Sequence, residues 1–226
     1  MIESNRGHLL PVYVLADESG SMIHHIDDLN DGLRSLHQAL LGEPMAAAKV
    51  RFSVLGFSDD VIERVHLVDL RSANEFPLLT TRGMTSYATA FEDLISRIPA
   101  DIQGLKAEGY QVHRPAVFLF SDGLPNRGED WRDAHRRLTD RQLTLGAPNI
   151  IAVGIEDADA QTINAVATQP EFGFIVNKGV EVGDAIAKFC TALTRSVIAS
   201  GRSLGSPNPQ LTVDKPEGFT VAIDVI

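Results

Sequence analysis

The stretch that decides the fold is LPVYVLADESGSM, residues Leu10 to Met22, where a short apolar run stops abruptly at a polar loop. Val12 to Ala16 has the length and the continuous apolar character of a buried strand. The loop that follows carries Asp17, Ser19 and Ser21, whose side-chain oxygens recur at every second position, and Gly20 permits a tight bend between them. A strand that ends in crowded oxygen atoms predicts a ligand site at the edge of a sheet.

Beyond this stretch, apolar runs of strand length alternate with segments of helical period. Residues 51–57 and 61–70 flank a Ser-Asp-Asp turn and predict an antiparallel hairpin. The other predicted strands are residues 12–16, 116–120, 149–153 and 172–176, and the predicted helices are residues 26–40, 87–98, 130–143, 160–167 and 182–197. Alternation of this kind requires crossover connections. We therefore predict an α/β, Rossmann-like open sheet of six mostly parallel strands, with one antiparallel edge strand and helices on both faces.

The C-terminal part of the chain differs in composition. Ser200 to Pro209 is rich in Gly, Ser and Pro, which is typical of a linker. Leu211–Val213 and Phe219–Ile226 then flank a Pro-Glu-Gly turn and predict a short β-hairpin. The predicted organisation is a domain over residues 1–199 and a linker with a hairpin over residues 200–226. This apolar tail either packs on its own domain or adds to a partner's sheet.

Charge and composition exclude several classes of protein. The 226 residues include 20 Lys and Arg against 30 Asp and Glu, a net charge of −10, so a nucleic-acid partner is not expected. No apolar stretch has the length of a signal peptide or a membrane span, so we expect a cytoplasmic protein with no membrane contact. Cys190 is the only cysteine and lies among apolar residues, which indicates a buried structural thiol.

Two further segments place oxygen atoms near the first loop. Thr85 precedes the second amphipathic helix, and Asp122 follows the central apolar strand 116–120 in the sequence Phe-Ser-Asp-Gly. Hydroxyls and carboxylates are hard ligands that suit Mg²⁺ or Mn²⁺ rather than zinc. Alone, the D-x-S-x-S pattern does not separate a metal site from a helix cap, because Ser and Asp also cap helices.

Together, the stretches LPVYVLADESGSM, RGMTSYATAFEDL and VFLFSDGLPN resemble the metal-ion-dependent adhesion site (MIDAS) of the von Willebrand factor type A (vWA) family. The resemblance covers roughly residues 10 to 198, and it is greatest for bacterial tellurium-resistance (TerY-like) vWA proteins. It implies that five residues form an intact metal site: Asp17, Ser19, Ser21, Thr85 and Asp122. It also implies a non-enzymatic interaction module that binds a partner protein's Asp or Glu through Mg²⁺, with Mn²⁺ or Ca²⁺ as alternatives, in a bacterial stress-response assembly.

Other interpretations of the motifs are weaker. A haloacid-dehalogenase-type phosphatase needs a second Asp two residues after the first, and Ser19 occupies that position, so a phosphoryl-transfer enzyme is the second hypothesis. A vWA fold with an empty metal site is the third. Gly201–Gly205 matches the G-x-S-x-G pattern without a preceding strand, and Asp157 and Asp159 match only part of a calcium loop.

Several polar residues near these motifs are expected to have ordinary structural roles. Ser121, Ser86 and Glu18 are expected to serve the loops in which they lie, and His24 and His25 to be solvated at a helix entrance. Four arginines in the predicted helix 130–143 are expected to form a solvated basic face, namely Arg132, Arg136, Arg137 and Arg141.

Overall fold

The computed structural model describes residues 6–73, 78–122, 124–144, 146–156, 158–204 and 206–221. Its strands are β1 (His8–Asp17), β2 (Val50–Phe57), β3 (Val61–Val68), β4 (Gln111–Val112), β5 (Ala116–Ser121), β6 (Asn149–Gly154), β7 (Gly173–Val176) and β8 (Phe219–Val221). Its α-helices are α1 (Ile26–Leu41), α2 (Pro44–Ala47), α3 (Tyr87–Ala107), α4 (Trp131–Thr139), α5 (Ala160–Val166) and α6 (Val182–Ser203). Two short 3₁₀ turns cover Gly20–His24 and Pro170–Phe172.

The strands form one sheet in the order β3-β2-β1-β5-β6-β7-β8, with β4 paired to the start of β1. The central strands β2, β1, β5, β6 and β7 are parallel to their neighbours in this order. The edge strands β3 and β8 run antiparallel to β2 and β7. The chain builds outward from β1 through β2 to β3 and then resumes on the other side of β1 with β5. The strand order therefore reverses between β1 and β5, where ligands bind in open sheets of this kind.

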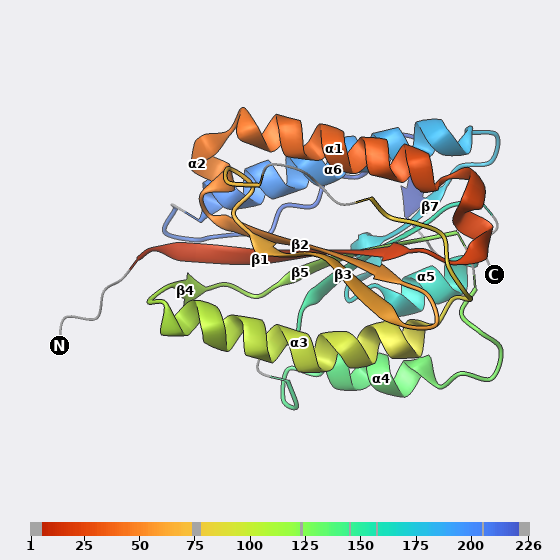
Figure 1. The fold of residues 1–226 in the computed structure, drawn as a ribbon, viewed down its shortest axis with the longest axis horizontal. Coiled ribbons are helices and arrows are strands. Elements are labelled where there is room, and N and C mark those ends of the chain that lie inside the picture. The colour runs from red at the N-terminus through yellow and green to blue at the C-terminus, as the bar shows by residue number, and fades with distance from the viewer. Residues whose placement is uncertain are drawn as a thin grey trace.

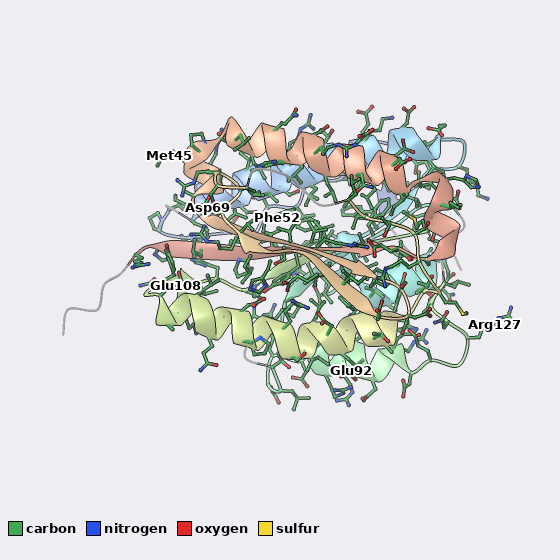
Figure 2. The ribbon with its side chains drawn as sticks, in the orientation of Figure 1. Met45, Phe52, Asp69, Glu92, Glu108 and Arg127 are labelled. Carbon is green, nitrogen blue, oxygen red and sulfur yellow. The ribbon has the colours of Figure 1, made fainter. Side chains whose placement is uncertain are left out.

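Helices cover both faces of this sheet, as predicted. Figure 1 shows α1 and α6 on one face and α3 and α4 on the other. Alternate residues of β1 enter the two cores: Val12 and Val14 pack on the α1/α6 side, and Tyr13 and Leu15 pack on the α3/α4 side. Side chains fill both spaces, and Phe52 of β2 lies between the sheet and the α1 layer (Figure 2). Cys190 is buried in the α1/α6 core, and burial raises the pKa of its thiol to about 12, which confirms a structural role.

The predicted architecture is confirmed, but the predicted number of strands is too small. The described chain forms eight strands instead of six. The two additional strands are β4, which has only two residues, and β8, which lies in the expected tail. A two-residue strand is too short to show an alternating pattern. The helix predicted over residues 87–98 is also longer than its apolar pattern indicates: α3 continues through Pro99 to Ala107.

The described part of the tail packs on its own domain. Residues 200–203, expected in a linker, form the last turn of α6. Leu211–Val213 is not a strand; Leu211 and Val213 pack against the α1/α6 core, and β8 pairs with β7. The predicted hairpin is therefore not formed by the described residues, because Phe219–Val221 pairs with the edge strand β7 instead of with Leu211–Val213. Residues 222–226, expected in its second arm, lie outside the described residues.

No helix in the described part of the chain is both long enough and apolar enough to span a bilayer.

Candidate metal site at the sheet edge

The candidate site lies where β1 and β5 end side by side, at the reversal of strand order. Asp17 is the last residue of β1, and Asp122 directly follows Ser121, the last residue of β5. The strands pair in parallel from Val12 with Ala116 to Ala16 with Phe120. This register brings the first predicted loop and Asp122 to the same edge of the sheet.

Asp17 is fully buried, and neutral groups bond both of its carboxylate oxygens. The backbone N–H of Ser19 donates to Oδ1 at 2.8 Å, and the Ser121 hydroxyl donates to Oδ2 at 2.6 Å. Burial raises the pKa of Asp17 to about 6, although these hydrogen bonds oppose the shift. Ser121 therefore orients Asp17 directly, which is more specific than the loop role expected for it.

The next three predicted residues form a chain of hydroxyl and carboxylate oxygens. Ser19 Oγ lies 3.0 Å from Ser21 Oγ, and the Ser21 hydroxyl donates to Asp122 Oδ1 at 3.0 Å. Asp122 is 4% exposed, and its second oxygen, Oδ2, is buried with no hydrogen-bond partner among the described residues. Burial raises the pKa of Asp122 despite the bond from Ser21. Oδ2 is thus a carboxylate oxygen whose usual partner is not supplied by the described protein.

Thr85 reaches the same edge on a neighbouring loop, and main-chain bonds hold that loop in place. The N–H of Gly20 donates to Gly83 O at 3.0 Å, and the N–H of Asn126 donates to Thr85 O at 2.9 Å. A Cβ at Gly83 would lie 1.8 Å from Oδ2 of Asp59, so a larger residue there would displace the Asp59 side chain from this loop. The loop of Thr85 is therefore fixed between the loops that follow β1 and β5.

Glu18, next to Asp17, is the best-paired carboxylate of this edge. It is fully buried and accepts two bonds from Arg64 at 3.0 Å, one from Arg82 at 2.7 Å and one from the Thr80 N–H at 3.0 Å. Its carboxylate packs against Gly56, where a Cβ would lie 2.2 Å from the carboxyl carbon. Glu18 thus ties the first loop to β3 and to the segment leading to Thr85, a role that was missed because the partners are 46 to 64 residues away.

His25 departs from the expectation that both histidines are solvated. Its side chain is only 13% exposed, and Nε2 lies 2.5 Å from Oε1 of Glu156. The charges of His25 and Glu156 both act on Asp122, the first lowering its pKa and the second raising it. His24 is exposed, as predicted. Because Glu156 follows β6, sequence spacing gives no signal that the two side chains meet.

Three large apolar side chains surround this edge in solvent. Ile23 is 62% exposed, Met84 62% and Leu124 57%. Each lies one or two residues from a predicted metal-site residue, namely Ser21, Thr85 and Asp122. Exposed apolar residues that flank a polar centre are typical of an interaction surface.

The other sequence candidates have structural roles in the fold. Ser86 caps α3 by accepting from Thr89 N, and Asp159 caps α5 by accepting from Thr162 N. Ser203 of the G-x-S-x-G pattern lies in α6 rather than after a strand, and Gly205 of that pattern and Asp157 lie outside the described residues. On α4, Arg136 and Arg137 pair with Asp133, and Arg132 stacks over Trp131. Arg141 lies beyond α4, which ends at Thr139.

The donor set fits a small hard cation better than a softer metal. No group of three or more His, Cys, Asp or Glu side chains in the described ranges could hold a metal, so the candidate ligands are mainly hydroxyls. Adjacent ligands of an octahedral ion at about 2.1 Å lie about 3.0 Å apart. The distances from Ser19 Oγ to Ser21 Oγ and from Ser21 Oγ to Asp122 Oδ1 have this value.

No protein-family model and no curated relative matches the chain. Among solved structures, the pilus adhesin SpaC from Lactobacillus rhamnosus GG is 13% identical with a TM-score of 0.65, over 86% of this chain and 30% of that one. Proximal thread matrix protein 1 from the mussel byssus is 16% identical with a TM-score of 0.59, over 85% and 49%, and another of its structures has a zinc-occupied MIDAS motif.

A von Willebrand factor type A protein from Catenulispora acidiphila is 13% identical with a TM-score of 0.50, over 96% of this chain and 56% of that one. The present chain thus spans about half or less of the first two neighbours. At these identities the likeness concerns the fold alone. The chain has the vWA fold.

Proposed function

We propose that this chain is a metal-dependent protein-interaction module that binds a partner's Asp or Glu through a divalent cation. The ion would be held by Asp17, Ser19, Ser21, Thr85 and Asp122, with Mg²⁺ as the preferred ion and Mn²⁺ or Ca²⁺ as alternatives. The observation that carries the proposal is Asp122 Oδ2, a buried carboxylate oxygen without a partner among the described residues. Leaving such a group unpaired costs about 1–3 kcal/mol or more, so its retention indicates a ligand.

The neighbouring residues define how the site would work. Asp17, with both oxygens bonded by Ser19 and Ser121, fixes the loop. Neutral hydroxyls from Ser19, Ser21 and Thr85 would leave most of a cation's charge available for an incoming carboxylate. When bound, the ion supplies that positive charge and an open coordination position. A cation of this kind also allows an acidic chain, of net charge −10, to bind an acidic ligand.

The partner is best described as a protein. Ile23, Met84 and Leu124 are exposed around the predicted ligands and provide apolar contact area that a small acid would not use. The three motif stretches support a place in a bacterial tellurium-resistance or stress-response assembly. The vWA fold of adhesins and matrix proteins is consistent with a binding role rather than a catalytic one.

Thermal unfolding with and without metal tests the proposal. Mg²⁺ at about 100 times its Kd should stabilise the native chain by about 2.7 kcal/mol, which is a rise in Tm of about 5–10 °C. Ser21→Ala should lose most of this rise, because Ser21 joins Ser19 to Asp122. The control Ser96→Ala removes an exposed hydroxyl on α3 and should keep the full rise. A native chain that gains nothing from Mg²⁺, Mn²⁺ or Ca²⁺ would be a scaffold with an empty site, contrary to the proposal.

Binding of a partner protein is tested by immobilising this chain and capturing partners from a lysate of the source cells. Binding should need Mg²⁺, be lost in EDTA and in Ser21→Ala, and survive in Ser96→Ala. Met84→Ser should weaken capture without changing the metal-dependent rise in Tm, because Met84 contributes surface rather than a ligand. Capture that is indifferent to EDTA would contradict a carboxylate-to-metal contact.

A further inference from the structure

A second site lies at the opposite end of the sheet, where β5 and β6 begin. A cavity of about 280 Å³ opens there between the segment after α4, the starts of these strands and the C-terminal tail. Six polar side chains line this cavity, which we name the basic pocket: His113, Arg114, Arg141, Asn149, Gln169 and Gln210. The candidate metal site lies at the carboxyl ends of β1 and β5, so the two sites are separate.

The charge of the basic pocket sets it apart from the rest of the chain. Its described lining contains no Asp or Glu, and neither Arg114 nor Arg141 forms an ion pair with a described residue. Nine other arginines do pair with carboxylates: Arg34, Arg51, Arg64, Arg71, Arg82, Arg97, Arg136, Arg137 and Arg202. Four other arginines also form no ion pair with a described residue, but the basic pocket brings two such arginines and no described acid to one cavity, in a chain with a net charge of −10.

The two arginines are close enough to repel each other. Burial lowers the pKa of Arg114, and the positive charge of Arg141 lowers it further. Arg114 is also held in place, since its Nη1 donates to the carbonyl oxygen of Ala147. Like charges at one cavity repel each other, less strongly where one of them is exposed, as Arg141 is, and a negative charge bound between them would remove the repulsion.

The remaining walls supply further hydrogen-bonding groups. His113 Nε2 lies 2.8 Å from Nδ1 of His8, which orients the His113 ring. The tail wall is held by Ser203, whose hydroxyl donates to Gln210 O at 2.7 Å and accepts from Gln210 N at 3.1 Å. Amide groups of Asn149, Gln169 and Gln210 complete a lining that can donate to several oxygens of one ligand.

We propose that the basic pocket binds a small soluble phosphate monoester. A phosphoryl group carries nearly two negative charges at pH 7 and three strong acceptor oxygens, which match two guanidinium groups and the neighbouring amides. A single carboxylate would neutralise only one arginine. The volume lies at the lower end of the range for ligand pockets, which favours a compact ester over a nucleotide. Because the phosphoryl group must enter a cavity, we assign it to a free ester rather than to a lipid surface.

Calorimetric titration of glycerol 3-phosphate into metal-free protein tests this proposal. We expect saturable binding with a Kd below about 1 mM. Arg141→Gln should weaken it about tenfold or more, because Arg141 is exposed, forms no ion pair with a described residue and supplies one of the two charges. The control Arg136→Gln removes the same charge from the surface of α4 and should change the Kd less than about twofold.

The proposal would be overturned if the native chain showed no saturable binding, or if Arg141→Gln and Arg136→Gln weakened binding equally. It would also be overturned if citrate bound as tightly as the phosphate ester. Binding to phosphatidic acid vesicles without binding to glycerol 3-phosphate would be a fourth contrary result. Asp122→Asn should leave the Kd unchanged, since Asp122 lies at the other end of the sheet. The outcome is therefore independent of whether the metal site functions as proposed.

Discussion

Asp17 and Glu18 are neighbours in the sequence and equally buried, yet they lie in opposite electrostatic environments. Glu18 is bonded by the guanidinium groups of Arg64 and Arg82, which neutralise its charge. Asp17 accepts hydrogen bonds from the backbone N–H of Ser19 and the hydroxyl of Ser121, and Asp122 accepts one from the hydroxyl of Ser21. One side of the loop is electrostatically complete, whereas the other holds two buried carboxylates that form no salt bridge with a described Lys or Arg.

Under the proposed function, this difference separates a structural carboxylate, Glu18, from the carboxylates that would serve a cation. Burial of an unpaired charge is unfavourable, and proteins retain it mainly where a ligand completes the site. Glu18 holds the loops together through residues of β3 and the segment leading to Thr85. Among the described carboxylate oxygens of this loop pair, Asp122 Oδ2 is the one left without a hydrogen-bond partner, where the proposed cation would bind. Substitutions on the Glu18 side should change stability without metal, and substitutions on the Asp122 side should change the response to metal.

The largest effect is expected for Glu18→Gln. It leaves two partly buried arginines facing a neutral amide, and loss of one partner of a buried ion pair costs about 3–5 kcal/mol. The free energy of unfolding from urea titration measures this loss. Asp60→Asn is the matched control, because Asp60 pairs with the same Arg82 but is 69% exposed, and it should cost less than about 1 kcal/mol. If Glu18→Gln were no more costly than Asp60→Asn, the structural role of Glu18 would be wrong.

Gly56→Ala should have the next largest effect. The added Cβ would overlap the Glu18 carboxylate, and such overpacking costs about 1–3 kcal/mol. Gly104→Ala on α3 is the control, since no side chain or backbone lies within 4 Å of its added Cβ. That variant should gain about 0.5–1 kcal/mol from helix propensity. Urea unfolding of both proteins checks the opposite signs, and a neutral Gly56→Ala would contradict close packing against Glu18.

Ser121→Ala should have the smallest effect on stability. It removes the Ser121 hydroxyl that donates to the Asp17 carboxylate, and loss of such a bond costs about 1.5 kcal/mol. Because Asp17 orients the first loop, the variant should also reduce the metal-dependent rise in Tm. Ser96→Ala should leave both quantities unchanged, since its hydroxyl bonds only within α3. A loss with Ser121→Ala as large as that with Glu18→Gln would remove the contrast between the two carboxylates.

Much of the fold follows from periodicity. The apolar run of residues 116–120 and the three-four spacing of residues 26–40 correspond to β5 and α1, because buried strands and amphipathic helices impose those periods. The tail was harder to predict. Leu211–Val213 and β8 each carry apolar residues, but their partners are α6 and β7, and a local hairpin pattern cannot indicate such distant contacts.

The candidate site could be predicted only in part, for a similar reason. Asp17, Ser19 and Ser21 share one short motif, and Asp122 follows a strand whose position in the sheet could be anticipated. Glu18 was assigned a loop role and His25 a solvated one, because Arg64, Arg82 and Glu156 reach them only through the folded chain. Sequence identifies the oxygen atoms of the site but not the charges that surround them.

The unfolding free energy of the native chain and of Asp122→Asn, each in EDTA and in saturating Mg²⁺, tests the metal site most directly. In EDTA, Asp122→Asn should be more stable than the native chain by about 1 kcal/mol, because it removes a buried carboxylate with an unpaired oxygen. In Mg²⁺ at about 100 times the native Kd, the order should reverse, since only the native chain gains about 2.7 kcal/mol. The same order in both solutions, with no gain for the native chain, would contradict a metal site at Asp122.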